Sequence, residues 1–113
     1  MNVVFKRVKN ALIIKPEGEI DAESAKMMRR KIDIEYDTLA VRDMIFDMTN
    51  VWFMDSSGIG MIIGRYKRVK TLNGVVKIFG ADKTVRRIIE LSGLGTIVKV
   101  YTNEKEAVGA DAR

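Results

Sequence analysis

Short apolar segments separated by turn residues predict a series of β-strands along this chain. Residues 3–9 and 11–17 form the first two, joined in a hairpin at Asn10, a residue that tolerates tight turns. Residues 18–21 follow the second strand and end it. Three more strands are predicted where apolar and β-branched residues recur, at residues 44–48, 75–79 and 96–101.

Apolar residues at helical spacing predict helices between these strands. The first runs from about Ala22 to Tyr36 behind Asp21, which suits a helix N-cap. Its inward side chains are expected to be Ala25, Met28, Ile32 and either Ile34 or Tyr36. The third helix ends before Gly93 and is marked by Val85, Ile88, Ile89 and Leu91. Asn103 begins a short terminal helix.

The second helix opens near Ser56 and separates an apolar face from a basic one. Its apolar positions are Ile59, Ile62, Ile63, Tyr66 and Val69. Its other face is filled by Arg65, Lys67, Arg68 and Lys70. Basic residues elsewhere follow the same rule, so the net charge of +5 reflects solvated helix faces. No nucleic-acid-binding motif is present, and no direct nucleic-acid partner is expected.

The element order predicts an α/β fold. The sequence β-β-α-β-α-β-α-β requires a mixed β-sheet with the crossover helices packed on it. With 113 residues, of which 47% are hydrophobic, the chain suits a single domain over residues 1–113, with a frayed tail at about residues 109–113.

Composition excludes several kinds of protein. Without cysteine there is no disulfide framework and no thiolate site. The apolar run at residues 11–14 is too short for a signal peptide, and no run is long enough to span a membrane. We therefore expect a cytoplasmic protein with no membrane partner.

The candidate site lies at residues 55–60, where an apolar patch leads into the second helix. Either Asp55 or Ser56 can cap the first amides of that helix. Glycines weaken a helix interior, so Gly58 and Gly60 indicate close approach, either of the helix to the sheet or of a partner to the turn. Both Asp21 and Ser56 follow strands, and loops beyond strand ends share one edge of such a sheet.

Catalytic arrangements find little support in these residues. With no histidine in the chain, a Ser-His-Asp triad is excluded. Ser56 lacks the upstream glycine of a nucleophile elbow, and the glycine spacing departs from the dinucleotide-binding fingerprint. Nothing in the spacing of Asp21 and Asp55 favours paired acid-base carboxylates over helix capping. No enzyme activity, cofactor or metal is predicted.

Four short motifs together resemble one family. They are residues 53–60 (Phe-Met-Asp-Ser-Ser-Gly-Ile-Gly), 64–67 (Gly-Arg-Tyr-Lys), 18–21 (Gly-Glu-Ile-Asp) and 91–94 (Leu-Ser-Gly-Leu). The chain resembles, over nearly its whole length, the bacterial anti-sigma factor antagonists of the STAS class, particularly the sporulation type acting on sigma F. A STAS-like fold is therefore expected. Trp52 is bulkier than this family resemblance leads us to expect.

The resemblance implies a protein switch. Members bind an anti-sigma factor that is also a serine kinase, and the sigma factor is released. That kinase inactivates them by phosphorylating the first serine of the motif, which is Ser56 here, and a serine phosphatase reactivates them. The resemblance also implies a supporting partner-binding role for Asp21, Asp55, Ser57, Gly58, Ile59, Gly60 and Arg65.

A second hypothesis of another class stays open at this point. The start of the second helix is also suited to bind phosphate, because its free amides and dipole attract anions. The chain would then be a small nucleotide- or anion-binding sensor domain. That function requires saturable nucleotide binding by the isolated chain that depends on Ser56 and Gly58.

Overall fold

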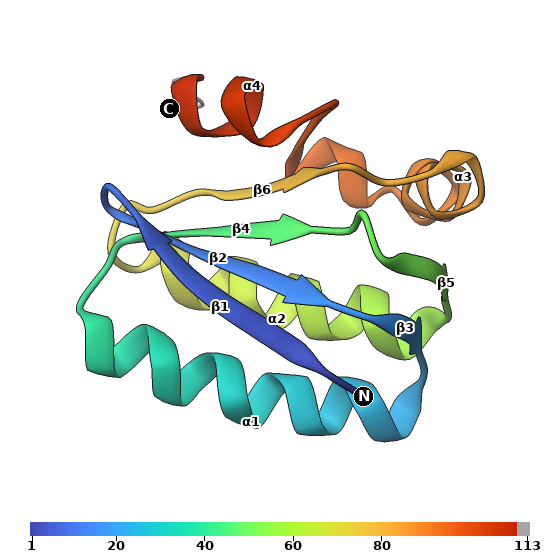
Figure 1. Ribbon diagram of the computed structural model, residues 1–113, viewed down its shortest axis with the longest axis horizontal. Helices are drawn as coiled ribbons and strands as arrows, with labels where there is room; N and C mark the ends of the chain where they lie inside the picture. Colours follow the sequence, from blue (N-terminus) through green and yellow to red (C-terminus); the bar gives the residue numbers. More distant parts are fainter. Residues whose placement is uncertain (111–113) are drawn as a thin grey trace.

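A mixed sheet with helices on both faces forms the body of the protein in the computed structural model, which describes residues 1–110 (Figure 1). The strands are β1 (Val3–Val8), β2 (Ala11–Pro16), β3 (Gly18–Ile20), β4 (Asp43–Asp47), β5 (Val51–Met54), β6 (Val76–Phe79) and β7 (Lys99–Tyr101). The helices are α1 (Ala22–Leu39), α2 (Ser56–Lys70), α3 (Lys83–Ser92), the 3₁₀ turn η1 (Leu94–Thr96) and α4 (Glu104–Gly109). The predicted α/β class is confirmed.

The main sheet has the strand order β1-β2-β4-β6-β7. Strands β1 and β2 form the predicted antiparallel hairpin, and the remaining neighbours pair in parallel. Parallel neighbours need a crossover, and α1, α2 and α3 supply the three that this order requires. The helices α1 and α2 lie together on one side of the sheet, and α4 lies on the other (Figure 1).

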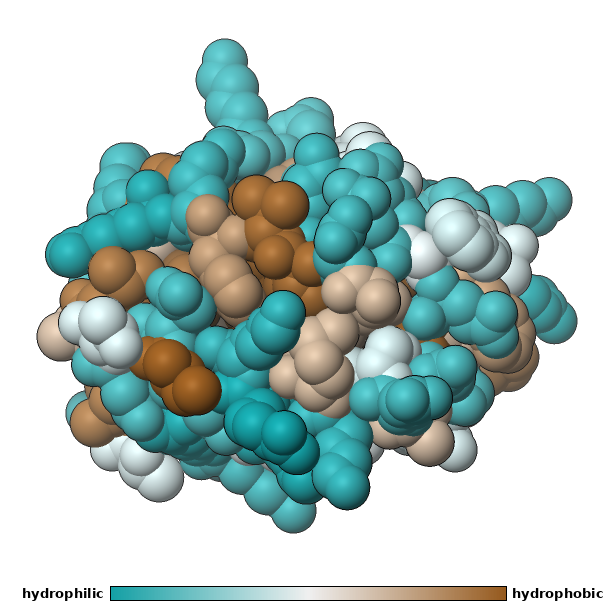
Figure 2. Space-filling model, turned by 60° about the horizontal axis from the view of Figure 1, so that its bottom comes forward, coloured by the Kyte–Doolittle hydropathy of each residue, from teal (hydrophilic) through white to brown (hydrophobic). Residues whose placement is uncertain are grey.

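Apolar side chains fill both faces of the sheet. Along β2, Leu12 and Ile14 join the larger core beneath α1 and α2, while Ala11 and Ile13 join a smaller cluster with Ala107 of α4. Strands covered on both faces read as continuous apolar runs, which explains the pattern of residues 44–48 as well. Figure 2 shows that the helical side is mainly hydrophilic, with a smaller apolar strip through its middle.

Helix α1 buries Tyr36 and exposes Ile34, which resolves the alternative left by the sequence. Ile34 is 61% exposed, whereas Tyr36 is 3% exposed and its hydroxyl donates to the carbonyl of Arg42 at 2.6 Å. Leu91, expected among the marking residues of α3, is 76% exposed. The core-facing residues of α3 are Val85 and Ile89.

Strands β3 and β5 were not expected, and they form a separate parallel pair. The sequence indicated only the end of a strand at residues 18–21 and an apolar patch at residues 51–53. Each strand is very short, and their pairing joins segments distant in sequence, so local periodicity does not reveal them. This pair positions the candidate site.

The C-terminal segment is held against the sheet by polar contacts. The buried Lys77 ammonium donates to the carbonyls of Ala107 at 2.7 Å and Ala110 at 2.6 Å, and Lys6 pairs with Glu104 at 3.0 Å. Of the tail predicted at about residues 109–113, Gly109 is the last residue of α4 and Ala110 accepts from Lys77, and residues 111–113 lie outside the described part of the chain.

The predicted last strand is shorter than expected. Thr96 ends η1, residues 97–98 form a turn, and strand β7 begins only at Lys99. None of the helices within residues 1–110 combines the length and apolar character needed to cross a membrane.

Candidate functional site at the ends of strands β3 and β5

The ends of β3 and β5 bring the starts of two helices to the same edge. Ile20 lies opposite Met54 in the parallel pair. Asp21 follows β3 and caps α1, and Asp55 follows β5 and caps α2. The Asp55 amide donates to the Ile20 carbonyl at 3.1 Å, which ties the two ends together. The expectation that residues 21 and 56 share one edge is confirmed.

Asp21 forms a reciprocal capping box with Ser24. The Asp21 carboxylate accepts from the Ser24 amide at 2.9 Å, and the Asp21 amide donates to the Ser24 hydroxyl at 2.9 Å. The hydrogen bonds from the backbone and then the side chain of Ser24 lower the pKa of Asp21. Asp21 is exposed, so a partner protein has access to its carboxylate while it caps α1.

The lowered pKa of Asp21 predicts a loss of stability in acid. A carboxyl whose pKa is lower in the folded state than in the unfolded state stabilises the fold at pH values above its unfolded-state pKa of about 3.9. This stabilisation is lost as the pH falls through the folded-state pKa. In Asp21→Asn the cap is retained but does not titrate. We expect the urea midpoint of this variant to fall less between pH 7 and pH 3 than that of the unaltered chain.

A Glu23→Gln variant is the matched control, because it removes a charge from the same turn without removing the cap. The pKa of Asp37 is also lowered, by its hydrogen bond from Arg68. Part of the loss of stability in acid therefore remains in the Asp21→Asn variant. Parallel pH profiles for the Asp21→Asn variant and the unaltered chain would contradict a stabilising ionised cap.

Helix α2 is capped by Asp55, not by Ser56. The Asp55 carboxylate accepts from the Ser57 amide at 2.8 Å, and its carbonyl accepts from the amides of Gly58 at 3.1 Å and Ile59 at 3.3 Å. Ser56 is therefore the first helical residue, and it is exposed. Its hydroxyl is available at the surface while the cap beside it is complete.

The two motif glycines serve different purposes. A Cβ on Gly58 would lie 2.3 Å from Cγ and 2.8 Å from Sδ of Met54, and 3.0 Å from Cγ2 of Ile20, so this glycine permits the helix to pack on β3 and β5. A Cβ on Gly60 would meet no atom of the described residues within 4 Å. Close approach of helix to sheet thus explains Gly58, and Gly60 stands exposed at the surface.

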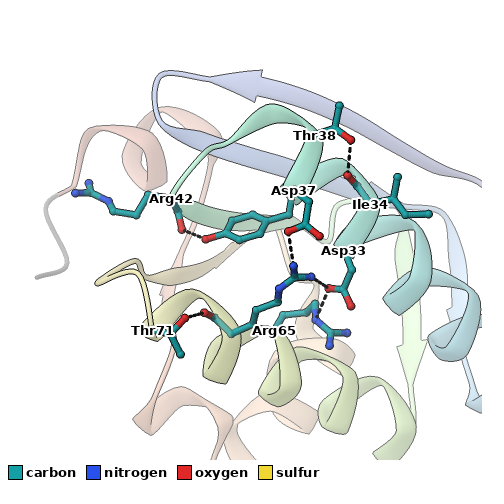
Figure 3. A network of polar contacts seen from close by, with 9 residues as sticks. Asp33, Ile34, Asp37, Thr38, Arg42, Arg65 and Thr71 are labelled. Atoms are coloured by element: carbon teal, nitrogen blue, oxygen red, sulfur yellow. Dashed lines mark hydrogen bonds and ion pairs between the residues drawn. The ribbon is translucent and has the colours of Figure 1, made fainter.

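Arg65 lies apart from the solvated basic face of α2, as the resemblance implied when it singled this residue out. The residue is 7% exposed, and its Nε lies 3.1 Å from Oδ1 of Asp33 on α1. Arg68 approaches the same oxygen at 2.9 Å and also pairs with Asp37. Figure 3 shows Asp33 turned toward Arg65, and the ion pairs of Arg68 with Asp33 and Asp37 also join α2 to α1.

The residues that the resemblance marks for partner binding fall into two groups. Those at the surface, fully or partly, are Asp21, Asp55, Ser56, Ser57 and Gly60. Those buried beneath it are Gly58, Ile59 and Arg65. The second group supports the first from below, so only the exposed group offers atoms for direct contact at the surface.

Two aromatic side chains beside the site were missed as candidates. Trp52 is 63% exposed and Phe53 is 41% exposed, both on β5 directly before the motif. The indole lies over Gly18, where a Cβ would be 3.5 Å from the ring and φ is +105°. The sequence showed an apolar patch here, but strand β5 buries its two ends and exposes its middle, which apolar character alone does not reveal.

The described residues contain no group of three or more acidic, histidine or cysteine side chains arranged to hold a metal ion. The site is thus a surface of one exposed hydroxyl, two capping carboxylates and two aromatic rings. Such a surface offers hydrogen bonds, charge and apolar area to another protein.

Comparison with known families decides where the chain belongs. Residues 2–107 match the STAS domain family. The chain belongs to this family. An anti-sigma F factor antagonist from Paenibacillus polymyxa is 30% identical to the STAS domain described here over 108 residues, 96% of this chain and 92% of that protein. An anti-sigma-B factor antagonist from Bacillus subtilis is 29% identical, covering 96% and 97%.

Solved structures match this STAS domain as well. The anti-sigma factor antagonist SpoIIAA in its unphosphorylated form is 29% identical with a TM-score of 0.81, covering 95% of this chain and 93% of that one. The Bacillus cell fate determinant SpoIIAA in the phosphorylated form is 28% identical with a TM-score of 0.72, covering 95% and 96%. The predicted STAS-like fold is confirmed.

Proposed function

We propose that this STAS domain is an anti-sigma factor antagonist, a regulatory binding protein rather than an enzyme. Relatives named as antagonists match it over nearly its whole length and theirs. The observation that carries the proposal is the placement of Ser56, exposed at the first position of α2 while Asp55 completes the cap. A regulator of sigma factors acts where transcription occurs, so we propose the bacterial cytoplasm as the location of this chain.

The partner that we propose is an anti-sigma factor with serine kinase activity. Unmodified, the chain binds this partner and the sigma factor is released. The kinase then phosphorylates Ser56 and ends the interaction, and a serine phosphatase restores it. The solved phosphorylated form of a 28% identical relative supports a phosphorylated state of this fold.

The local chemistry of Ser56 suits a switch that acts at the surface. A phosphate adds a charge of about −1.5 to −2 and three acceptor oxygens. Asp55 caps α2, so modification of Ser56 leaves the capping hydrogen bond of the helix in place. The new charge lies beside the Asp55 carboxylate at an exposed position, where it changes what a partner meets.

Exposed aromatic rings next to this serine are expected to anchor the partner. Trp52→Ala should lower the affinity for the anti-sigma factor about tenfold, or ~1.4 kcal/mol, because tryptophan at an interface often carries a large share of binding. Isothermal titration calorimetry measures the change. Leu72→Ala is the matched control, since Leu72 is 56% exposed but follows the other end of α2. Equal affinity of both variants would remove Trp52 from the interface.

A competition experiment tests the proposed function itself. The unmodified chain is added to a complex of anti-sigma factor and sigma factor, and free sigma factor is measured by size-exclusion chromatography. We expect release in proportion to the chain added. The same chain phosphorylated by the kinase should release far less. Failure of the unmodified chain to release any sigma factor would overturn the antagonist role.

The start of α2 is a poor anion site in this structure. Asp55 already accepts from the Ser57 amide with its carboxylate, and its carbonyl takes the next two amides. A nucleotide phosphate there would compete with a carboxylate for the same donors. Gly58 is buried against Met54, so the nucleotide-sensor alternative has no contact from it. Partner binding is therefore the function that this edge supports best.

A further inference from the structure

A shallow hollow lies beside the exposed indole of Trp52, between the turn that precedes β5 and the start of α3. This Trp52 hollow holds about 440 Å³ and is lined by Glu17, Thr49, Asn50, Val51, Trp52 and Asp82. The chain has 20 lysine and arginine residues against 15 acidic ones, yet the described residues that line this hollow include two carboxylates and no basic side chain. The Trp52 hollow is therefore an acidic site on a basic protein.

A short strand pair and a helix start bring these side chains together. The Gly18 amide donates to the Asn50 carbonyl at 2.9 Å, and Gly18 lies opposite Val51 in the parallel pair of β3 and β5. Glu17 is thereby held next to the turn that leads into β5. Asp82 caps α3, and α3 packs beside β5 (Figure 1). Backbone contacts and a helix cap therefore fix the positions from which the two carboxylates reach the hollow.

The two carboxylates have acceptor capacity that the fold does not use. Both are exposed, and none of the salt bridges within residues 1–110 includes either of them. Oδ1 of Asp82 accepts from the Val85 amide at 2.9 Å. The Thr49 amide and hydroxyl both donate to Asp47, at 3.0 and 2.5 Å, so neither is offered to the hollow. A cationic donor is the group that these carboxylates bind most strongly.

Trp52 adds an aromatic ring to the same hollow. The ring lies against Gly18, where a Cβ would be 3.5 Å from it, but the residue is still 63% exposed. Packing within the described residues therefore leaves most of the indole open to a partner. Tryptophan is the aromatic side chain that attracts a cation over its face most strongly. A guanidinium can stack on such a ring and donate to a carboxylate at the same time, because it is planar and carries several donors.

We propose that the Trp52 hollow receives an arginine side chain of the partner protein, stacked on the indole and hydrogen-bonded to Glu17 and Asp82. For the identity of that partner, the anti-sigma factor, the inference rests on the proposed function. Arginine suits the hollow better than lysine, whose ammonium is not planar and is more strongly hydrated. No residue of the motif at positions 53–60 lines the hollow, so this contact is additional to that of the serine.

A fluorescence titration tests the hollow without any partner protein. Trp52 is the only tryptophan of the chain, so the emission reports on this indole alone. The probe is N-acetyl-arginine amide. The reference is N-acetyl-citrulline amide, which has nearly the same shape without the charge, at matched ionic strength. We expect a saturable change in emission with the arginine probe only. Equal changes with the two compounds, or no saturable change with the arginine probe, would overturn the proposal.

Two double variants separate the hollow from general electrostatic attraction. Glu17→Gln with Asp82→Asn should weaken binding of the arginine probe about tenfold, and asparagine retains the cap of α3. Glu35→Gln with Glu90→Gln removes the same charge from helix positions outside the hollow and should change the affinity less than about twofold. Equal losses in the two double variants would contradict a specific site.

Calorimetry with the anti-sigma factor tests whether that partner supplies the arginine. The Glu17→Gln with Asp82→Asn variant should bind it about tenfold more weakly. Trp52→Leu should lose more affinity than Trp52→Phe, because leucine lacks the aromatic face. Equal losses in these two variants would overturn the stacking.

The two proposals fail in different ways. If the unaltered chain releases no sigma factor but binds the arginine probe, the antagonist role fails and the chemistry of the hollow is supported. If the Glu17→Gln with Asp82→Asn variant binds the anti-sigma factor with full affinity and releases the sigma factor, the antagonist role is supported and the arginine contact is overturned.

Discussion

Phosphorylation of Ser56 is expected to lower the affinity for the anti-sigma factor about 100-fold, or ~3 kcal/mol. Ser56 is exposed and lies beside the Asp55 carboxylate, so the phosphate adds volume and negative charge where the partner packs. Titration calorimetry with the unmodified and the phosphorylated chain measures the difference. Ser57→Ala is the control, and its affinity should respond to phosphorylation as that of the unaltered chain does.

The backbone is expected to stay in place during this switch. Asp55, not Ser56, caps α2, so the helix start does not depend on the modified hydroxyl. Amide chemical shifts of the two forms should differ only near residue 56. Large shifts far from this position would show that the fold itself changes, and the surface mechanism would be wrong.

Gly58→Ala is expected to destabilise the fold by about 1–3 kcal/mol, the usual cost of overpacking a filled core. The new Cβ would lie 2.3 Å from Cγ of Met54, a side chain that is 1% exposed and has little room to move. The start of α2 would have to shift away from β3 and β5. Urea unfolding followed by circular dichroism measures the loss.

Gly60→Ala is the matched control for this prediction. It introduces the same methyl group two residues further along α2, where no atom of the described residues lies within 4 Å of the added Cβ. Helix propensity then favours alanine, so we expect a gain of about 0.5–1 kcal/mol. Equal effects of the two substitutions would show that Gly58 is not a packing residue.

Much of the fold follows from local patterns in the sequence. The hairpin, the strand at residues 44–48 and the amphipathic helices each have a clear period, because one face or both faces of each element are buried. Strands β3 and β5 escaped prediction. Their pairing depends on contact between segments far apart in the chain, and they are too short to show a period.

The sequence predicts where the candidate site lies, but not which of its side chains are buried. Asp21 and Asp55 are strong cap residues that follow strands, which was enough to place both at one edge. Helical spacing groups Arg65 with the basic residues of α2, and only the family resemblance set it apart from a solvated face. Its burial depends on Asp33 of another helix, which spacing within α2 does not show.

Glycine roles also required the structure. Gly58, Gly60 and Gly64 look alike in the sequence, since each interrupts the same helix. Only the neighbours of an added Cβ distinguish them: Met54 and Ile20 crowd the first position, and no atom of the described residues lies within 4 Å of the other two. Long-range packing therefore separates a glycine that the fold requires from two that it does not require.

The most direct test of the switch is phosphopeptide mass spectrometry after incubation with ATP and the anti-sigma kinase. The unaltered chain is compared with the Ser56→Ala and Ser57→Ala variants. Our account predicts phosphate on Ser56 in the unaltered chain and in Ser57→Ala, and none in Ser56→Ala. Phosphate on Ser57, or no phosphate where the kinase is demonstrably active, would contradict it.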